Sequence, residues 1–188
     1  TPREWRITRY DARVDVDAAG TANVRLEFDF NFGNSPGHGP FVTLPLQQEV
    51  ADNPDVWRMI DVNVRDVASP SGAPADKLLT TEDGSLLIRI GREGTRVRGV
   101  QTYVVNYTAR GLIAPRHETS GLDEVNWNVI GTGWQVPLEN VTASITGPAA
   151  TSETACFTGG RFSTPCPHAA DGATGLIKRS DLGRDRDE

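Results

Sequence analysis

Three features that the sequence lacks limit what this 188-residue chain can be. It has no apolar run near the roughly 18–20 residues of a membrane-spanning helix, so no such helix is expected within it. It has no group of lysines and arginines free of carboxylates, and its formal net charge is −6, which argues against a nucleic-acid-binding surface. Apolar residues do not recur at helical spacing over any long stretch, which disfavours a helical fold.

Cysteine is also scarce, since the chain has only Cys156 and Cys166. A disulfide between them would close a short loop and add about 2–3 kcal/mol of stability. It would also require an oxidising compartment outside the cytoplasm. Two alternatives stay open: free thiols, or a zinc site that also uses His168. The zinc site lacks a close pair of cysteines and a fourth ligand at the usual spacing, so the disulfide is the prediction.

Glycine and proline are frequent, at 19 and 12 residues, and they separate short segments in which apolar and polar residues alternate. Successive side chains of a strand point to opposite faces, so these segments predict half-buried strands. Trp5–Val16 and Val24–Phe32 flank a turn and predict a hairpin. Both faces of Gln101–Ala109 are apolar, which places this strand inside a sheet. Further strands are predicted at 41–46, 59–67, 86–90, 125–130, 136–145 and 174–178, with a polar connection at 47–57 and a turn at 82–85.

About nine or ten short strands, with no repeat and no domain boundary, predict a single all-β domain over residues 1–188. The expected architecture is a two-sheet antiparallel sandwich, immunoglobulin-like in its general arrangement, and an antiparallel barrel is the alternative. The charged residues 181–188 are expected to form a frayed tail towards a membrane segment. Phe28, Tyr103 and Trp127 are predicted to lie in the core. Replacing Phe28 or Trp127 by alanine should therefore cost about 3–5 kcal/mol.

No pattern in the sequence is specific for catalysis. Asp123 and Glu124 are adjacent carboxylates, but neighbours on a strand point to opposite faces, whereas a glycosidase needs its two carboxylates to face each other across a cleft. His38, His117 and His168 all lie in loop sequence without the spacing of a metal site, so their role stays open. No metal, cofactor or catalytic residue is predicted.

Three further motifs have structural explanations. Ser35 and Ser120 lack the G-x-S-x-G pattern of a nucleophile elbow. The Gly131–Gly133 segment lacks the lysine and the following helix of a phosphate loop, so it is interpreted as a tight turn or bulge. Trp127 and Trp134 could stack on a sugar if both were exposed, but tryptophan in a sandwich strand is more often part of the core.

The order of several motifs resembles a known family. The motifs are Ile7-x-x-Tyr10-Asp11-Ala12, Val24-x-Leu26-x-Phe28-x-Phe30, Gly37-His38-Gly39 before Leu44-Pro45, Gly99-x-Gln101-Thr102-Tyr103-Val104-Val105-x-Tyr107, and Glu124-Val125-Asn126-Trp127-Asn128-Val129-Ile130-Gly131-x-x-Trp134-x-Val136-Pro137-Leu138. Together they resemble the N-terminal extracytoplasmic domain of domain-of-unknown-function family 2207, a set of predicted bacterial membrane proteins. The resemblance covers about Trp5–Cys166. It implies that membrane-spanning segments lie outside this chain.

These observations predict a non-catalytic binding or interaction module on the extracytoplasmic side of a cell membrane, with an envelope protein or a cell-surface polymer as its partner. The alternative is a carbohydrate-binding or glycan-active β-sandwich, and a third hypothesis is a structural spacer. A partner-binding module needs an exposed apolar patch or an unpaired strand. A lectin or glycosidase needs an open groove with a tryptophan face and convergent carboxylates.

Overall fold

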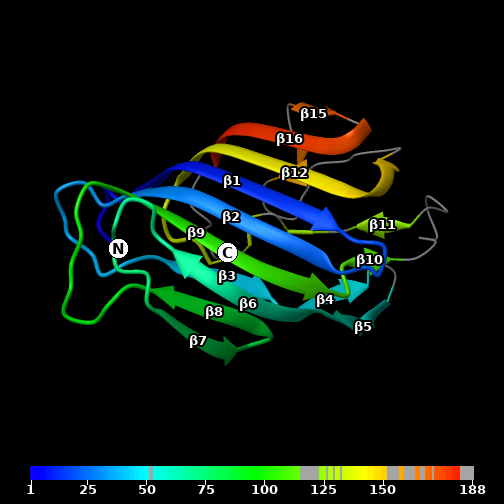
Figure 1. Ribbon diagram of the computed structural model, residues 1–188, viewed down its shortest axis with the longest axis horizontal. Coiled ribbons are helices and arrows are strands. Elements are labelled where there is room, and N and C mark those ends of the chain that lie inside the picture. The colour runs from blue at the N-terminus through cyan, green and yellow to red at the C-terminus, as the bar shows by residue number, and fades with distance from the viewer. Residues whose placement is uncertain are drawn as a thin grey trace.

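The computed structural model describes residues 1–50, 53–114, 123–125, 127–128, 130–131, 133–151, 157–158, 164–165, 168–170 and 172–182. These residues form strands, turns and loops, and none of them is helical. The strands gather into a large curved layer and several smaller sheets, as Figure 1 shows. The all-β sandwich that alternating polarity predicts is therefore confirmed.

The largest sheet has seven strands. In order across the sheet they are β15 (His168–Ala170), β16 (Gly172–Leu182), β12 (Leu138–Thr151), β1 (Arg6–Val16), β2 (Ala22–Asn31), β9 (Val100–Arg110) and β6 (Asp61–Ala68). The hairpin of β1 and β2 is as predicted, and β9 lies between β2 and β6, inside the sheet as expected. One pair departs from the antiparallel prediction, because β1 and β12 run parallel. Alternation identifies the buried face of a strand but not the direction of its neighbours.

The remaining strands form four small sheets. One has three strands, in the order β3 (Phe41–Pro45), β8 (Ser85–Ile90) and β7 (Lys77–Glu82). The others are the pairs β4 (Gln47–Val50) with β5 (Asn53–Met59), β10 (Ile113–Ala114) with β11 (Glu124–Val125), and β13 (Phe157–Thr158) with β14 (Thr164–Pro165). The turn between β7 and β8 is the predicted one. Its central residues, Asp83 and Gly84, both have positive φ angles, of 46° and 72°, as a type I′ hairpin turn requires.

The core lies between the inner face of the seven-stranded sheet and the inner face of the β3-β8-β7 sheet. Alternate residues of β1, β2, β8 and β9 point into it and are buried. Phe28 is completely buried at its centre. The Phe28 ring packs against the rings of Tyr10, Tyr103 and Trp134, with centroids 6.1, 5.8 and 5.6 Å apart. Such aromatic contacts stabilise a core beyond the area that they bury.

Two predicted elements are wrong in detail. The strand predicted at 125–130 is only the end of β11, and the described residues from Trp127 to Pro137 lie outside strands. The connection predicted at 47–57 is the hairpin of β4 and β5, which places Trp57 in a strand. Polar residues dominate β4, so it lacked an apolar signal. Asp181 and Leu182, expected in the tail, pair with β12, and residues 183–188 lie outside the described part of the chain.

Candidate functional site

Strand β7 lies exposed at the edge of the β3-β8-β7 sheet. In the described residues, no strand pairs with the far side of β7. All six of its residues are exposed. Its pairing with β8 is regular over its whole length. An exposed, regular edge strand is a template for pairing with another chain.

The direction of the β7 backbone groups follows from its hydrogen bonds with the neighbouring strand. The carbonyl of Asp76, just before β7, accepts a hydrogen bond of 2.9 Å from the N–H of Gly91, just after β8. Successive residues direct their backbone groups to opposite sides of a strand, and so the groups of Lys77, Leu79 and Thr81 point to the open edge. Each of these residues offers an N–H donor and a carbonyl acceptor there.

Three other strand edges have features that obstruct such pairing. β6 has a bulge after Val64, next to the charged Arg65, and β5 contains Pro54. The edge of β3 is covered, because Gly131 lies so close that a Cβ atom on it would come within 2.6 Å of the carbonyl oxygen of Thr43. Bulges, prolines, charges and covering segments are the usual protections of an edge. β7 has no bulge and no proline, and its charged residues are only at its ends.

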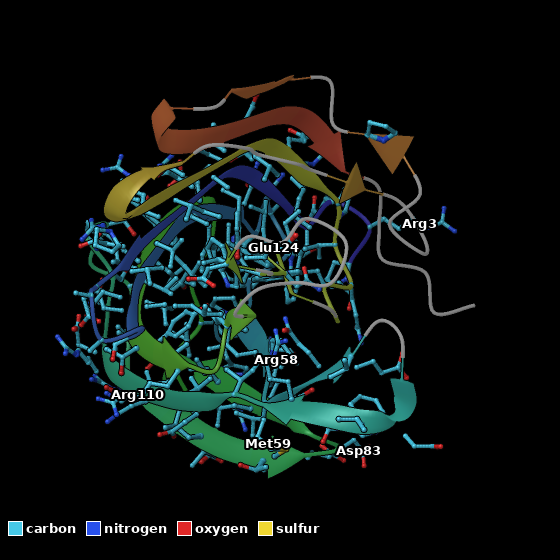
Figure 2. The ribbon with its side chains drawn as sticks, turned by 90° about the vertical axis from the view of Figure 1, so that its right-hand side faces the viewer. Arg3, Arg58, Met59, Asp83, Arg110 and Glu124 are labelled. Carbon is cyan, nitrogen blue, oxygen red and sulfur yellow. The ribbon has the colours of Figure 1, made fainter. Side chains whose placement is uncertain are left out.

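Large apolar side chains are exposed near this edge. Leu78 is 60% exposed on the outward-facing side of β7, and Leu79 is 42% exposed on the other side. Met59 of β5 is 67% exposed. It pairs with Gln47, whose side chain lies against Gly84 of the β7–β8 turn. Figure 2 shows Met59 and the turn residue Asp83 at the same end of the molecule.

The outer face of the seven-stranded sheet, which points away from the core, is polar and held by ion pairs. Arg9 donates to both carboxylate oxygens of Asp29, at 2.9 and 3.1 Å, and to Glu27 at 3.0 Å. Burial opposes ionisation of Asp29, but hydrogen bonds from Arg9 and Thr102 outweigh it and hold the pKa of Asp29 below its ordinary value. Hydrogen bonds from Arg25 and Arg9 likewise lower the pKa of Glu27. These carboxylates are therefore ionised at neutral pH.

A shallow depression of about 540 Å³ lies on this outer face, across β12, β1, β2, β9 and β6. Two of its hydrogen bonds hold carboxylates in place: Thr146 donates to Asp15 at 2.7 Å, and Asn106 donates to Asp66 at 3.0 Å. Other polar side chains that line it are Arg13, Asn23, Arg25, Arg65 and Ser144. Guanidinium, amide, hydroxyl and carboxylate groups together can bind the hydroxyls of a polyhydroxylated molecule.

The structure does not bring the tryptophans together as an open platform. Trp134 is buried, and its indole N–H donates to the carbonyl of Ile130 at 2.8 Å. Trp127 is half-buried against the core, and its side chain is hydrogen-bonded to the hydroxyl of Tyr107. Only Trp57 leaves about half of its surface, 46%, exposed. Stacking of a sugar on Trp127 and Trp134 together would therefore require the core to open.

The other predicted residues have the following places. Phe28 and Tyr103 are completely buried, and burial raises the pKa of Tyr103 to about 12. Asp123 is exposed before β11, and Glu124 is half-buried within it. The ring of His38 is hydrogen-bonded to the carbonyl of Thr95 at 2.9 Å.

Ser35 accepts a hydrogen bond of 2.8 Å at its carbonyl from the indole N–H of Trp5. His168 begins β15. Among the described residues, no group of three or more His, Cys, Asp or Glu side chains is placed to hold a metal ion. Cys156, Cys166, His117 and Ser120 lie outside the described residues, so the disulfide stays a prediction.

Leu78 and Leu79 precede the predicted turn at 82–85, and their exposure was not predicted. The sequence contained one signal of this exposure. Adjacent residues of a strand point to opposite faces, so two adjacent leucines cannot both face the same core. One of them had to lie on the solvent side. That the other is exposed as well depends on β7 being the last strand of its sheet, which no local pattern indicates.

Comparison with protein families gives a match over residues 6–177 to the predicted membrane protein (DUF2207) N-terminal domain. The chain belongs to this family. The resemblance of its motifs to the family is thereby confirmed, and the chain is a domain of a predicted membrane protein. No helix of the described residues is long and apolar enough to cross a membrane. A comparison with proteins of curated function found no match.

Solved structures of similar fold include leukotriene A4 hydrolase from Saccharomyces cerevisiae, with 11% sequence identity and a TM-score of 0.55. The match covers 94% of this chain and 27% of the hydrolase. An M1 zinc metallopeptidase from Deinococcus radiodurans matches with 11% identity and a TM-score of 0.51, over 96% of this chain and 40% of the peptidase. At this identity the likeness shows the fold alone. The DUF2207 domain thus spans about a quarter to two fifths of the length of these enzymes.

Proposed function

We propose that this DUF2207 domain is a non-catalytic interaction module on the extracytoplasmic side of a membrane protein, and that it binds a protein partner through the open edge of β7. The observation that carries the proposal is the contrast between strand edges. The edges of β3, β5 and β6 are covered, interrupted or charged, whereas β7 is regular, exposed and apolar at Leu78 and Leu79.

The mode of binding follows from the geometry of β7. An extended segment of the partner adds to the sheet, and the backbone groups of Lys77, Leu79 and Thr81 supply its hydrogen bonds. Side chains on the two faces of β7 then contact the partner, with Leu78 on one face and Leu79 on the other. Burial of this apolar surface adds about 25 cal/mol for each Å² removed from water.

Ionisation of the outer-face carboxylates supports the non-catalytic part of the proposal. Asp29 and Glu27 have lowered pKa values, so neither carries a proton to donate as a general acid at neutral pH. The similar solved structures are those of much longer enzymes. A likeness of fold alone does not assign their peptidase activity to this domain. The extracytoplasmic location rests on the family resemblance and on the predicted pairing of Cys156 with Cys166.

The experiment is site-specific photo-crosslinking in the full-length protein in its native membrane. A photo-reactive residue at position 78 should give a defined crosslinked product, and Thr81→Pro in the same chain should abolish it. Proline at position 81 removes an N–H that points to the open edge and leaves the pairing with β8 intact. A photo-reactive residue at position 6, on the large sheet, is the control. Equal products from positions 78 and 6, or no product from position 78, would refute the proposal.

A second candidate function is supported by the depression on the outer face. Its hydroxyl, amide, carboxylate and guanidinium groups suit a hydroxyl-rich cell-surface polymer without requiring a tryptophan platform. A glycan array tests it. Specific binding that is lost in Asn106→Ala and retained in Thr81→Pro would favour a carbohydrate-binding domain. Binding to no glycan would leave β7 as the interaction site.

A further inference from the structure

The charge of the outer-face depression selects among cell-surface polymers. We propose that the depression binds an anionic, hydroxyl-bearing polymer, whose carboxylate or phosphate groups contact a row of arginines across the large sheet. This inference rests on the second candidate function, since it names the class of polymer that the same depression binds. It does not depend on the open edge of β7.

The strand register aligns the side chains of this row. Arg13 of β1 is directly opposite Arg25 of β2. Arg25 is opposite Asn106 of β9, and Asn106 is opposite Asp66 of β6. All four side chains line the depression, on the face that points away from the core. The row therefore crosses four neighbouring strands within the depression.

A β-bulge adds a third arginine to the row. Arg65 has no partner in the ladder, because the bulge of β6 lies between Val64 and Asp66. Adjacent residues of a regular strand point to opposite faces, but a bulge turns one of them. As a result, Arg65 and Asp66 both line the depression. Within the described part of the chain, no carboxylate forms an ion pair with Arg65.

Arg13 and Arg25 keep donors available to a ligand. Nε of Arg13 donates to Asp11 at 2.9 Å, and one terminal nitrogen of Arg25 donates to Glu27 at 3.0 Å. These carboxylates offset the repulsion between two like charges that are opposite each other. Each bond occupies one nitrogen of its guanidinium, and about half or more of each arginine side chain is exposed. The other nitrogens can bind carboxylate or phosphate oxygens.

The lining of the depression is basic, although the chain as a whole is acidic. Three guanidinium groups line it, against two carboxylates, whereas the formal net charge of the chain is −6. The two carboxylates, Asp15 and Asp66, already accept hydrogen bonds from Thr146 and Asn106. An acidic polymer is therefore attracted to the depression more than to the surface as a whole.

The spacing of the arginines favours a polymer over a single small anion. Neighbouring strands are about 4.8 Å apart and β9 lies between β2 and β6, so the backbones of Arg25 and Arg65 are about 10 Å apart. Anionic groups on successive units of one polymer can reach both positions.

Calorimetric titration of the 188-residue chain with defined polymers tests the inference. Polygalacturonate supplies carboxylates, poly(glycerol phosphate) supplies phosphates, and dextran is the uncharged control. One of the anionic polymers should bind at least about tenfold more tightly than dextran, and the preferred one identifies the anionic group.

Substitution of single arginines distinguishes this site from non-specific attraction. Arg25→Gln and Arg65→Gln should each weaken binding of the anionic polymer about fivefold, because each removes charge-assisted hydrogen bonds. Arg89→Gln is the matched control. It makes the same charge change at an exposed residue of β8, outside the depression, and should bind like the parent.

Asp66→Asn separates an anionic ligand from a neutral one. It removes a negative charge from the lining but keeps an oxygen that can accept the hydrogen bond from Asn106. An anionic polymer should then bind about two- to fivefold more tightly, because a like charge has been removed. A neutral glycan whose hydroxyls donate to the carboxylate should bind more weakly.

The inference and the function on which it rests fail in different ways. Equal weakening by Arg65→Gln and Arg89→Gln, or weaker binding of the anionic polymer to Asp66→Asn, would overturn the inference. Specific binding of a neutral glycan that is lost in Asn106→Ala, without preference for an anionic polymer, would overturn it and leave the second candidate function standing. Binding of no polymer and no glycan would overturn both and leave the proposal for β7 unaffected.

Discussion

Gly131 lies directly against the carbonyl oxygen of Thr43, where a Cβ atom would come within 2.6 Å. This approach places the Gly131 loop over the edge of β3, so that the β3-β8-β7 sheet is closed on one side and open on the other. Glycine is required at this position for two reasons, since its φ angle is also positive, at 75°.

The first prediction separates these two reasons. Gly131→Ala should destabilise the domain by about 2–4 kcal/mol, because it combines a positive φ with a clash against backbone. Gly72→Ala is the matched control: Gly72 has a φ of 87°, but an added Cβ atom there would meet nothing within 4 Å. It should cost only about 1 kcal/mol. Urea unfolding of both variants measures the difference, and equal losses would show that the contact with Thr43 contributes nothing.

The second prediction concerns two buried tyrosines on β9. The hydroxyl of Tyr103 is buried without a hydrogen-bond partner among the described residues, whereas that of Tyr107 is hydrogen-bonded to Trp127. Tyr103→Phe removes an unsatisfied polar group and should leave stability unchanged or raise it by about 1 kcal/mol. Tyr107→Phe removes a hydrogen bond and leaves the indole N–H unpaired, and it should cost about 1–2 kcal/mol. Thermal unfolding of the two variants measures the difference in stability. A larger loss for Tyr103→Phe than for Tyr107→Phe would contradict the hydrogen bonding described for the two hydroxyls.

A third prediction tests the centre of the core. Phe28→Ala should cost about 3–5 kcal/mol, because Phe28 is completely buried and packs against three aromatic rings. Trp127→Ala should cost less than Phe28→Ala, since Trp127 is only half-buried. Denaturant unfolding measures the stability loss of each variant, provided that the m-values of the two variants and the parent agree. A larger loss for Trp127→Ala would place the centre of the core beside Trp127 instead.

The fourth prediction is a pH dependence. Asp29 and Glu27 have folded pKa values below their ordinary values of 3.8 and 4.5. A lowered pKa stabilises the fold above the unfolded pKa, and this stabilisation disappears as the pH falls through the folded values. Arg9→Gln should therefore destabilise the domain at neutral pH, by at most about 1 kcal/mol, and much less in acid well below pH 4.

The control for the Arg9 variant is Arg6→Gln. Arg6 makes one exposed contact of 3.4 Å with Glu139, so its replacement should change stability little at any pH. Unfolding curves recorded from neutral to acid pH compare the two variants. A penalty for Arg9→Gln that stays constant over this range would mean that Asp29 and Glu27 do not titrate differently in the folded state.

Several features of the fold could be predicted because they depend on neighbours in the sequence. Alternation along Val24–Phe32 identified a strand and placed Phe28 inward, since side chains of a strand change face at every residue. Asp83 and Gly84 identified the turn between β7 and β8, because they tolerate positive φ. The order of motifs identified the family.

The sequence by itself therefore identified strands such as β1, β2 and β9, the buried face of β2, and the hairpin that β1 forms with β2. Only the tertiary structure decided that β1 lies parallel to β12, that Trp134 is more deeply buried than Trp127, and that β7 is the strand left open while Gly131 covers β3. The physical reason is one of range. Alternation and turn preference act over a few residues, whereas the order of strands in a sheet depends on contacts between segments far apart in the chain, and that order determines which backbone groups remain free to bind.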